Sequence, residues 1–157
     1  MYDYRNEIRR LMIAVNQVEG LYYSAAKKLG VKENTLTLLY ALDDGKSHSQ
    51  KQICVEWFIP RTTINTIVKE CVDAGYIKLV SEEHSKEKKV AITDKGKIYA
   101  QTVLQAIYHA EQNAMTATLT KFTPDFVEVM EQFVAHLQKE IEQQIINQLE
   151  KPRKAEI

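Results

Sequence analysis

Residues 49–93 read SQKQICVEWFIPRTTINTIVKECVDAGYIKLVSEEHSKEKKVAIT, and the expected architecture of the whole chain follows from this stretch. The pattern predicts a short helix, a break at Pro60 and a second helix that stops at Gly75. Two alternating segments joined by a polar link come next and predict a β-hairpin. This order of elements is that of a winged helix-turn-helix, a shape that reads duplex DNA.

The first helix of the stretch is expected to begin at Ser49. Ser49 and Gln52 have the spacing of a capping box, in which each side chain satisfies a backbone donor of the other residue. Pro60 disfavours helical geometry at the residue before it, so the helix is short. The same proline suits the first turn of a new helix, because the N–H that it lacks is not needed there. The residues expected to face inward are Ile53, Cys54 and Trp57.

The second helix is expected to run to about Ala74 and to carry the residues that read DNA. Its buried row is predicted to be Ile64, Ile67, Val68, Cys71 and Val72. Its other face carries Arg61, Thr62, Thr63, Asn65, Thr66 and Lys69. Arginine can grip guanine and asparagine can grip adenine through paired hydrogen bonds, while threonine offers a methyl group to thymine. An ordinary solvated helix face is the alternative, and the Pro60 turn and the hairpin favour DNA reading over it.

The hairpin is expected to pair Tyr76–Val80 with Lys89–Ile92, and the link Ser81–Lys88 is entirely polar. Lysines in and beside this link could meet phosphates or enter the minor groove: Lys86, Lys88 and Lys89. A solvated loop of mixed charge is the alternative, because glutamates are interspersed there. Ser49 and Gln50, at a helix N-terminus, could bind a phosphate through backbone N–H groups.

Long amphipathic helices are expected on both sides of this stretch. One runs from about Asp3 to Leu29 and is stopped by Gly30. A shorter helix, with Asn34 or Thr35 as its cap, ends in the turn at residues 43–45. After the hairpin, Thr93 caps a long helix, and residues 123–125 start another. The last helix has apolar residues in steps of three and four: Phe126, Met130, Phe133, Leu137, Ile141, Ile145 and Leu149.

The apolar stripes of the three long helices exceed what a small DNA-reading lobe could cover. An exposed stripe of that length usually marks a partner surface, and the simplest partner is a second copy of the chain. A monomeric bundle in which the three helices cover each other is the alternative.

Composition limits the remaining function classes. Lys and Arg together number 21, as do Asp and Glu. Between Lys46 and Lys97 there are ten basic against seven acidic residues, which supports nucleic-acid binding only weakly. No apolar run approaches the roughly 18 residues of a membrane span, so a soluble, cytoplasmic protein is expected. Cys54 and Cys71 are expected to be small buried hydrophobic residues and not a disulfide pair.

The chain shows no constellation expected of an enzyme. It has no glycine-rich phosphate loop, and no nucleophile and base are spaced for catalysis. His109, Glu111 and His136 do not have the spacing of metal ligands. We therefore expect neither an enzyme nor a bound cofactor or metal.

The motifs together resemble the MarR family of bacterial transcription regulators, over nearly the whole chain. The resemblance is most specific at SQKQIC (residues 49–54), RTTINTIV (61–68), AGYI (74–77) and ITDKG (92–96). It implies a homodimer built by the first and last two helices that binds pseudo-palindromic promoter DNA, usually as a repressor. Many members of the family release DNA when a small, often phenolic or anionic, ligand enters a cleft between the two lobes.

By resemblance, residues 34–95 form the DNA-binding lobe, and residues 1–30 with 96–151 form the dimerisation lobe of a single protomer, 1–157. The implied DNA contacts are Ser49, Gln50, Arg61, Thr62, Thr63, Asn65, Thr66, Lys69, Lys86, Lys88 and Lys89. Tyr22, Tyr40 and His48 lie near where an effector cleft would be, although a core role is favoured for the tyrosines. The peroxide-sensing branch of the family uses a cysteine near the N-terminus, which this chain lacks.

The chain departs from the family pattern in the wing. Where the family usually carries Asp-x-Arg, this sequence has His84 and Lys86. Lysine keeps the charge but lacks the planar fork of arginine, so wing contacts with DNA are expected to be weaker or to be made by the neighbouring lysines. The alternative function is a winged-helix module that binds another protein and not specific DNA.

Overall fold

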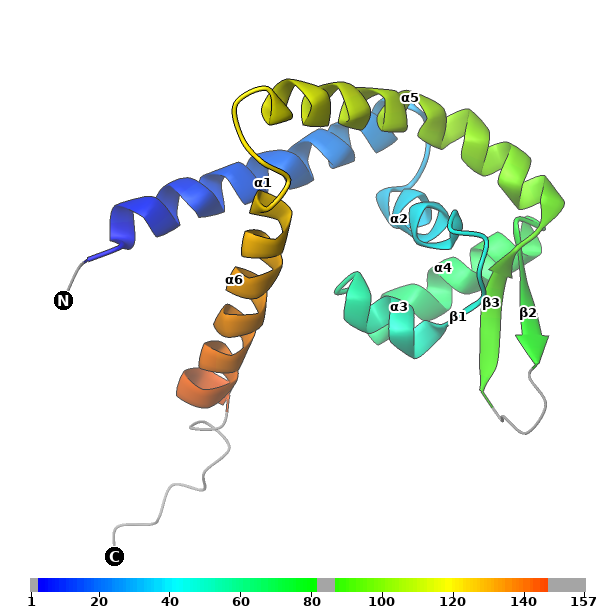
Figure 1. Cartoon of the computed structure of the whole chain (residues 1–157). Coiled ribbons are helices and arrows are strands. Elements are labelled where there is room, and N and C mark those ends of the chain that lie inside the picture. Colours follow the sequence, from blue (N-terminus) through cyan, green and yellow to red (C-terminus); the bar gives the residue numbers. More distant parts are fainter. Residues whose placement is uncertain (1–2, 82–86, 147–157) are drawn as a thin grey trace, which may run out of the picture. The chain divides into compact units, whose positions relative to one another are not determined.

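The computed structural model describes residues 3–81 and 87–146 and confirms a mainly α-helical chain with a winged helix-turn-helix (Figure 1). The elements, in chain order, are α1 (Arg5–Lys28), α2 (Glu33–Leu42), β1 (His48–Ser49), α3 (Gln50–Glu56), α4 (Arg61–Asp73), β2 (Ile77–Ser81), β3 (Lys88–Ile92), α5 (Asp94–Leu119), α6 (Phe126–Ile141) and the π-helical turn η1 (Glu142–Ile146). The chain divides into two compact units, Met1–Ala110 and Glu111–Ile157. We call the first the winged-helix unit.

The sheet has one strand more than the sequence predicted. The expected hairpin forms, with Ile77 opposite Ile92 and Ser81 opposite Lys88. The additional strand β1 pairs antiparallel with β3, so that the order is β1-β3-β2. The predicted two-stranded wing is confirmed as β2 and β3. The strand β1 was not predicted, because two residues are too few to show the alternation that marks a strand.

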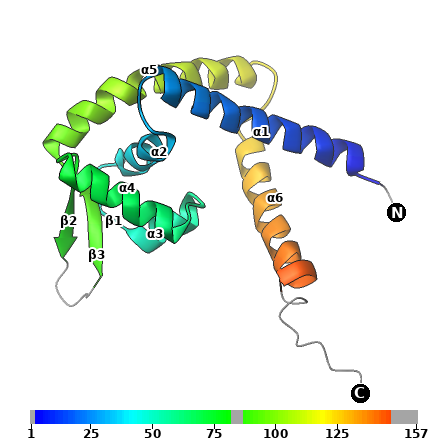
Figure 2. The same ribbon diagram turned by 180° about the vertical axis from the view of Figure 1, so that it is seen from behind.

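The core lies in the winged-helix unit, and every helix of the helix-turn-helix contributes to it. Figures 1 and 2 show α2, α3 and α4 grouped beside the sheet, with the first half of α5 following β3. The most deeply buried large side chains are Leu38, Leu39, Leu42, Ile53, Ile64, Val90 and Leu104. Two residues expected in the core are more than a third exposed, Trp57 at 39% and Val72 at 37%. Each lies at or next to a helix end, where the neighbouring turns no longer cover the apolar row.

Several predicted helix starts need correction. α2 begins at Glu33, before the expected caps Asn34 and Thr35, and no side chain caps it. Pro60 is the N-cap of α4 and lies outside its first turn, with its carbonyl accepting the first helical hydrogen bond from Ile64. At the start of α6, the Thr123 hydroxyl donates to the Asp125 carboxylate at 3.1 Å, and no side chain caps the helix.

The capping box at the start of α3 is half formed. The Ser49 hydroxyl accepts from the backbone N–H of Gln52 at 3.1 Å, as expected. The Gln52 side chain does not reach back to Ser49; its amide donates to Glu56 at 2.8 Å, one turn further along. The cap therefore satisfies one backbone N–H at the helix start, whereas a complete capping box would satisfy two.

The junction between the wing and α5 is held by Thr93 and Gly96. The Thr93 hydroxyl accepts from the backbone N–H of Gly96 at 2.9 Å, which confirms Thr93 as the cap of α5. The same hydroxyl donates toward the carbonyl oxygens of Gly75, at 2.7 Å, and Tyr76, at 3.1 Å. The Tyr76 ring stacks on Tyr99 with centroids 4.2 Å apart. This junction ties the end of α4 to the start of α5.

The second unit carries no buried side chain on α6, in the part of the chain that the structure describes. Several apolar residues of α6 are exposed, including Val129, Val134, Leu137 and Ile141. The predicted apolar position Leu149 lies outside the described residues. Among the described helices, none combines the length and apolarity needed to cross a membrane.

Replacing Gly96 with alanine should destabilise the fold. A Cβ at this position would collide with the carbonyl oxygen of Tyr76 and lie 2.8 Å from the Ile92 side chain. Overpacking of this kind lowers the free energy of unfolding by roughly 1–3 kcal/mol or more, which urea denaturation would measure.

Gly20→Ala is the matched control, because a Cβ there meets nothing within 4 Å. In the interior of α1 it should raise stability by roughly 0.5–1 kcal/mol. Equal effects of the two substitutions would contradict the close approach at Gly96.

Candidate nucleic-acid interface

Helix α4 presents one buried and one exposed face, as its sequence predicts. Ile64, Ile67, Val68 and Cys71 are buried against the core. The exposed side carries five of the predicted DNA-reading residues, which we call the reading face: Arg61, Thr62, Asn65, Thr66 and Lys69. Thr63 is half-buried and lies at the border between the two faces. The helix therefore exposes a polar face, while its buried apolar row packs it against the core.

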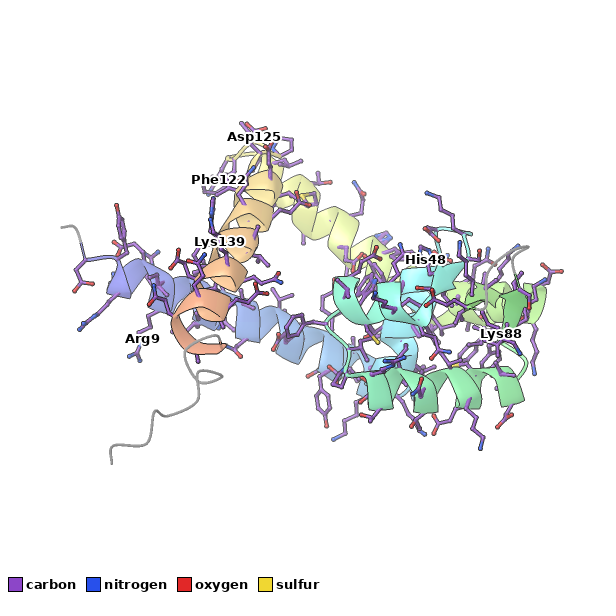
Figure 3. All side chains as sticks on the ribbon, turned by 90° about the horizontal axis from the view of Figure 1, so that it is seen from below. Arg9, His48, Lys88, Phe122, Asp125 and Lys139 are labelled. Atoms are coloured by element: carbon purple, nitrogen blue, oxygen red, sulfur yellow. The ribbon has the colours of Figure 1, made fainter. Side chains whose placement is uncertain are left out.

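A depression of about 390 Å³ brings four of the predicted residues together from three elements. It is lined by Gln50, Lys51, Cys54, Val55, Arg61, Asn65, Glu87 and Lys88. We call it the reading-face depression. Gln50 comes from α3, Arg61 and Asn65 from α4, and Lys88 from the start of β3. Figure 3 labels Lys88 beside the hairpin and His48 on the segment that leads into α3.

Cations outnumber the single carboxylate among the described residues of this depression. Lys51, Arg61 and Lys88 line it together with Glu87. Lys51 was missed by the sequence reasoning, although its position next to Gln50 in the first turn of α3 could have indicated it. Three cations around a concave polar surface favour a polyanionic partner.

The start of α3 adds polar groups to the same surface. The Ser49 hydroxyl is engaged as a cap acceptor and keeps its own O–H as a donor. The side-chain oxygen of Gln50 is buried and makes no hydrogen bond within the described part of the chain. An unsatisfied buried acceptor costs about 1–3 kcal/mol, so a donor from outside these residues would stabilise it.

The remaining predicted contacts are placed differently. The Thr66 hydroxyl donates to the carbonyl oxygen of Thr62 at 3.2 Å, which leaves its methyl group and lone pairs for a partner. Lys89 is half-buried and pairs with Ser49 and Val80 in the sheet. Lys86, together with the unusual His84, lies outside the described residues, so the predicted wing-tip contact stays a prediction.

The turn between α3 and α4 contains a strained residue that the sequence did not reveal. Phe58 has a φ of 51°, in the left-handed region, and its side chain is 91% exposed. A non-glycine residue there costs roughly 1–2 kcal/mol. The residues on both sides of Phe58 are held in place, because the Trp57 N–H donates to the Ile53 carbonyl at 3.0 Å and the N–H of the buried Ile59 donates to the Cys54 carbonyl at 3.2 Å. Val55 is also exposed, and it lines the reading-face depression.

A second cavity, of about 310 Å³, lies elsewhere in the winged-helix unit. It is lined by Tyr22, Glu33, Leu36, Thr37, Tyr40 and Trp57, and we call it the aromatic cavity. The Tyr40 ring meets Trp57 edge to face, with centroids 5.5 Å apart, and meets Tyr108 in the same way at 5.3 Å. Tyr22 and Tyr40 also pack against the core, as expected, so these tyrosines serve both surfaces.

His48, expected near an effector cleft, does not line the aromatic cavity. Its ring Nε2 lies 3.0 Å from both carboxylate oxygens of Asp44. The hydrogen bond with His48 lowers the pKa of Asp44, and the backbone N–H of Lys46 lowers it further. His48 therefore closes the turn between α2 and β1.

Residues 29–86 match the model of the MarR family. This segment of the chain is therefore similar to the MarR family. No curated protein sequence matches the chain.

Solved MarR structures extend the likeness beyond the matched segment. The MarR family regulator NMB1585 from Neisseria meningitidis superimposes with a TM-score of 0.70 at 17% identity, covering 90% of this chain and 98% of its own. SPO1453 from Silicibacter pomeroyi DSS-3 gives 0.68 at 14% identity, covering 83% and 93%. Staphylococcus aureus MarR, in complex with salicylate and kanamycin, gives 0.62 at 18% identity, covering 86% and 93%. At these identities the likeness shows the fold alone.

The two cysteines of the MarR-like chain differ in environment. Cys71 is 2% exposed, which confirms a buried hydrophobic role, and burial raises the pKa of its thiol. Cys54 is half-buried and lines the reading-face depression. Within the described residues, no group of three His, Cys, Asp or Glu side chains is placed to hold a metal ion.

Alkylation should therefore distinguish the two cysteines. Iodoacetamide should modify Cys54 in the folded protein and Cys71 only after unfolding. The thiolate is the reactive form, and burial both disfavours the Cys71 thiolate and shields Cys71 from the reagent. Peptide mass spectrometry of a time course measures both rates. Cys54→Ser should remove the fast phase, and fast modification of Cys71 in that variant would contradict the buried position.

Proposed function

We propose that this protein is a non-enzymatic, sequence-specific DNA-binding transcription regulator. The observation that carries the proposal is the reading-face depression, where Arg61 and Asn65 of α4 line the same concave surface as Lys51 and Lys88. It acts as a repressor on pseudo-palindromic promoter DNA, as its resemblance to the MarR family implies.

The groups of the depression suit two kinds of DNA contact. Arg61 and Asn65 are exposed and four residues apart, so they share one side of α4. Their planar side chains can each form paired hydrogen bonds to a purine in the major groove, Arg61 to guanine and Asn65 to adenine. Lys51 and Lys88 would meet phosphates, which fixes the register of the protein without reading sequence. Lys69 and Thr66 extend the reading face along the same helix.

A homodimer is supported by the exposed apolar side chains of the long helices. Ile8, Val18 and Leu21 of α1 are 46–70% exposed, and α6 buries none of its apolar residues within the described chain. Exposed stripes of this length usually mark a partner surface. In this proposal, residues 34–95 form the DNA-binding lobe, and residues 1–30 and 96–151 form the dimerisation lobe. A two-fold dimer matches a palindrome with half-sites about 34–36 Å apart.

The aromatic cavity is the proposed site of a small-molecule effector. It lies in the winged-helix unit, and its wall includes Trp57, the C-cap residue of α3. The solved Staphylococcus aureus MarR holds two small molecules, salicylate and kanamycin. An effector can shift the population of DNA-competent protein only by its differential affinity for the two states.

A second function has one observation in its favour. Two apolar residues near the ends of the α3–α4 connection, Val55 and Phe58, are 70% and 91% exposed, as in a protein-binding module. The α4 face itself is polar, however, and its arginine, threonines and asparagine suit base edges better than an apolar partner. We therefore rank a protein-interaction module second.

Arg61→Ala should relax base specificity at one position of the site. Selection of bound sequences from random duplex DNA at fixed salt should yield a palindrome for the wild-type protein. The variant should lose roughly 1–3 kcal/mol of specific binding and select that one base pair less strictly.

Lys27→Ala, a charge removed from the last turn of α1, is the matched control and should leave the selected sequence unchanged. A wild-type protein that enriches no sequence would overturn the proposed function. Equal weakening by Arg61→Ala on specific and random DNA would refute base reading by Arg61.

The chain should sediment as a dimer at micromolar concentration, with twice its mass of 18.1 kDa. Leu137→Glu should shift it toward the monomer, because a buried unpaired carboxylate opposes association. Lys139→Glu is the control, since it lies about 200° around the same helix. A wild-type monomer would sink the dimer model.

A further inference from the structure

The geometry points to a ligand class for the aromatic cavity: an organic cation with a compact aromatic or apolar body. The inference rests on the proposed function, because it names the effector of a ligand-responsive regulator. It departs from the phenolic or anionic ligands that the resemblance to MarR implies. Three features of the cavity carry it: aromatic walls, one carboxylate, and a nearby lysine held by another partner.

Aromatic side chains make up half of the residues that line the cavity. Tyr22 comes from α1, Tyr40 from α2 and Trp57 from the end of α3. The planes of Tyr40 and Trp57 meet at 64°, so these rings form two sides of a corner. Ring faces carry negative potential and attract cations, and aromatic cages of this type recognise quaternary ammonium groups. At about 310 Å³, the cavity is at the small end of ligand sites and suits a one-ring molecule.

The charge of the cavity has one sign. Glu33 is the only charged side chain among the described residues that line it. The Thr37 hydroxyl donates to the Glu33 backbone carbonyl at 3.1 Å, so it offers lone pairs and no proton to a ligand. An anionic ligand would face the Glu33 carboxylate without a lysine, arginine or histidine among these lining residues to pair with. A cation would gain the attraction of that carboxylate.

The lysine next to Glu33 is engaged elsewhere. Lys32 places its Nζ 2.8 and 2.9 Å from the two carboxylate oxygens of Glu70, at the far end of α4. The Lys32 ammonium group is therefore engaged by the Glu70 carboxylate and is not among the groups that line the cavity. The ion pair therefore preserves the negative character of the cavity.

The position of Trp57 gives the ligand a route to the reading face. Trp57 is the C-cap of α3, and the strained Phe58 follows it directly. Pro60, the N-cap of α4, comes two residues after Phe58. A ligand that packs on Trp57 thus contacts the first residue of the turn that leads into α4. The aromatic chain continues from Tyr40 to Tyr108, whose hydroxyl donates to Asp43 at 2.7 Å.

The chain contains its own reporter for the test, because Trp57 is its single tryptophan. The full-length protein would be titrated with phenyltrimethylammonium, with the neutral molecule of the same shape, tert-butylbenzene, and with the anion benzoate. Trp57 fluorescence reports occupancy, and calorimetry gives a second readout. We expect phenyltrimethylammonium to bind about tenfold more tightly than benzoate, through cation–π attraction and the carboxylate.

Two variants separate charge from shape. Glu33→Gln should weaken phenyltrimethylammonium binding about threefold or more and leave tert-butylbenzene within about twofold, because only the charge is removed. Tyr22→Leu should weaken the cation and spare the neutral molecule, since it replaces a ring face with an aliphatic side chain. Glu7→Gln, about four helical turns before Tyr22 on α1, is the matched control and should change neither affinity.

Benzoate binding as tightly as the cation would overturn the inference, as would an unchanged cation affinity in Glu33→Gln. Absence of binding by all three probes in both readouts would do the same. Each of these results leaves the proposed function standing if the selection from random DNA still yields a palindrome. Cation binding in a chain that selects no DNA would overturn the proposed function and keep the ligand class.

Discussion

The contact between Gly96 and the carbonyl of Tyr76 is the constraint on which the winged helix depends. At this point the chain leaving α4 and the chain entering α5 approach so closely that a single Cβ would separate them. Thr93 bonds to both sides of the same junction. The hairpin between them therefore starts and ends at one fixed place, and the direction of the wing follows from the direction of α4. The Tyr76–Tyr99 stack fills the outer side of the junction.

The polar and apolar surfaces of the winged-helix unit are divided by the same helices. α4 uses one row of side chains to anchor itself and the opposite row to form the reading face. α3 supplies Gln50 and Lys51 to the reading-face depression at its start and Trp57 to the aromatic cavity at its end. A seven-residue helix thus borders both candidate sites. This arrangement makes α3 a direct connection between the proposed effector site and the proposed DNA-binding site.

The sequence predicted the parts of the fold that local chemistry determines. Pro60 and Gly75 marked the ends of α4, and Thr93 marked the start of α5, because each has a distinct backbone or capping role. β1 was missed because its pairing with β3 depends on residues forty positions away. Phe58 was missed because a left-handed backbone in a bulky residue has no local signature. For the candidate site, spacing along α4 identified Arg61 and Asn65, whereas the depression that joins them to Lys51 and Lys88 required tertiary structure.

The two-residue strand β1 links the wing to α3. Ser49 pairs through its backbone with Lys89 of the wing, while its hydroxyl caps α3. One residue thus joins the wing to the first helix of the helix-turn-helix, and the Thr93 junction joins the wing to the second. Wing, α3 and α4 are coupled on both sides and are expected to move as one rigid head. In a dimer, the separation and tilt of two such heads would be the coordinates left for an effector to adjust.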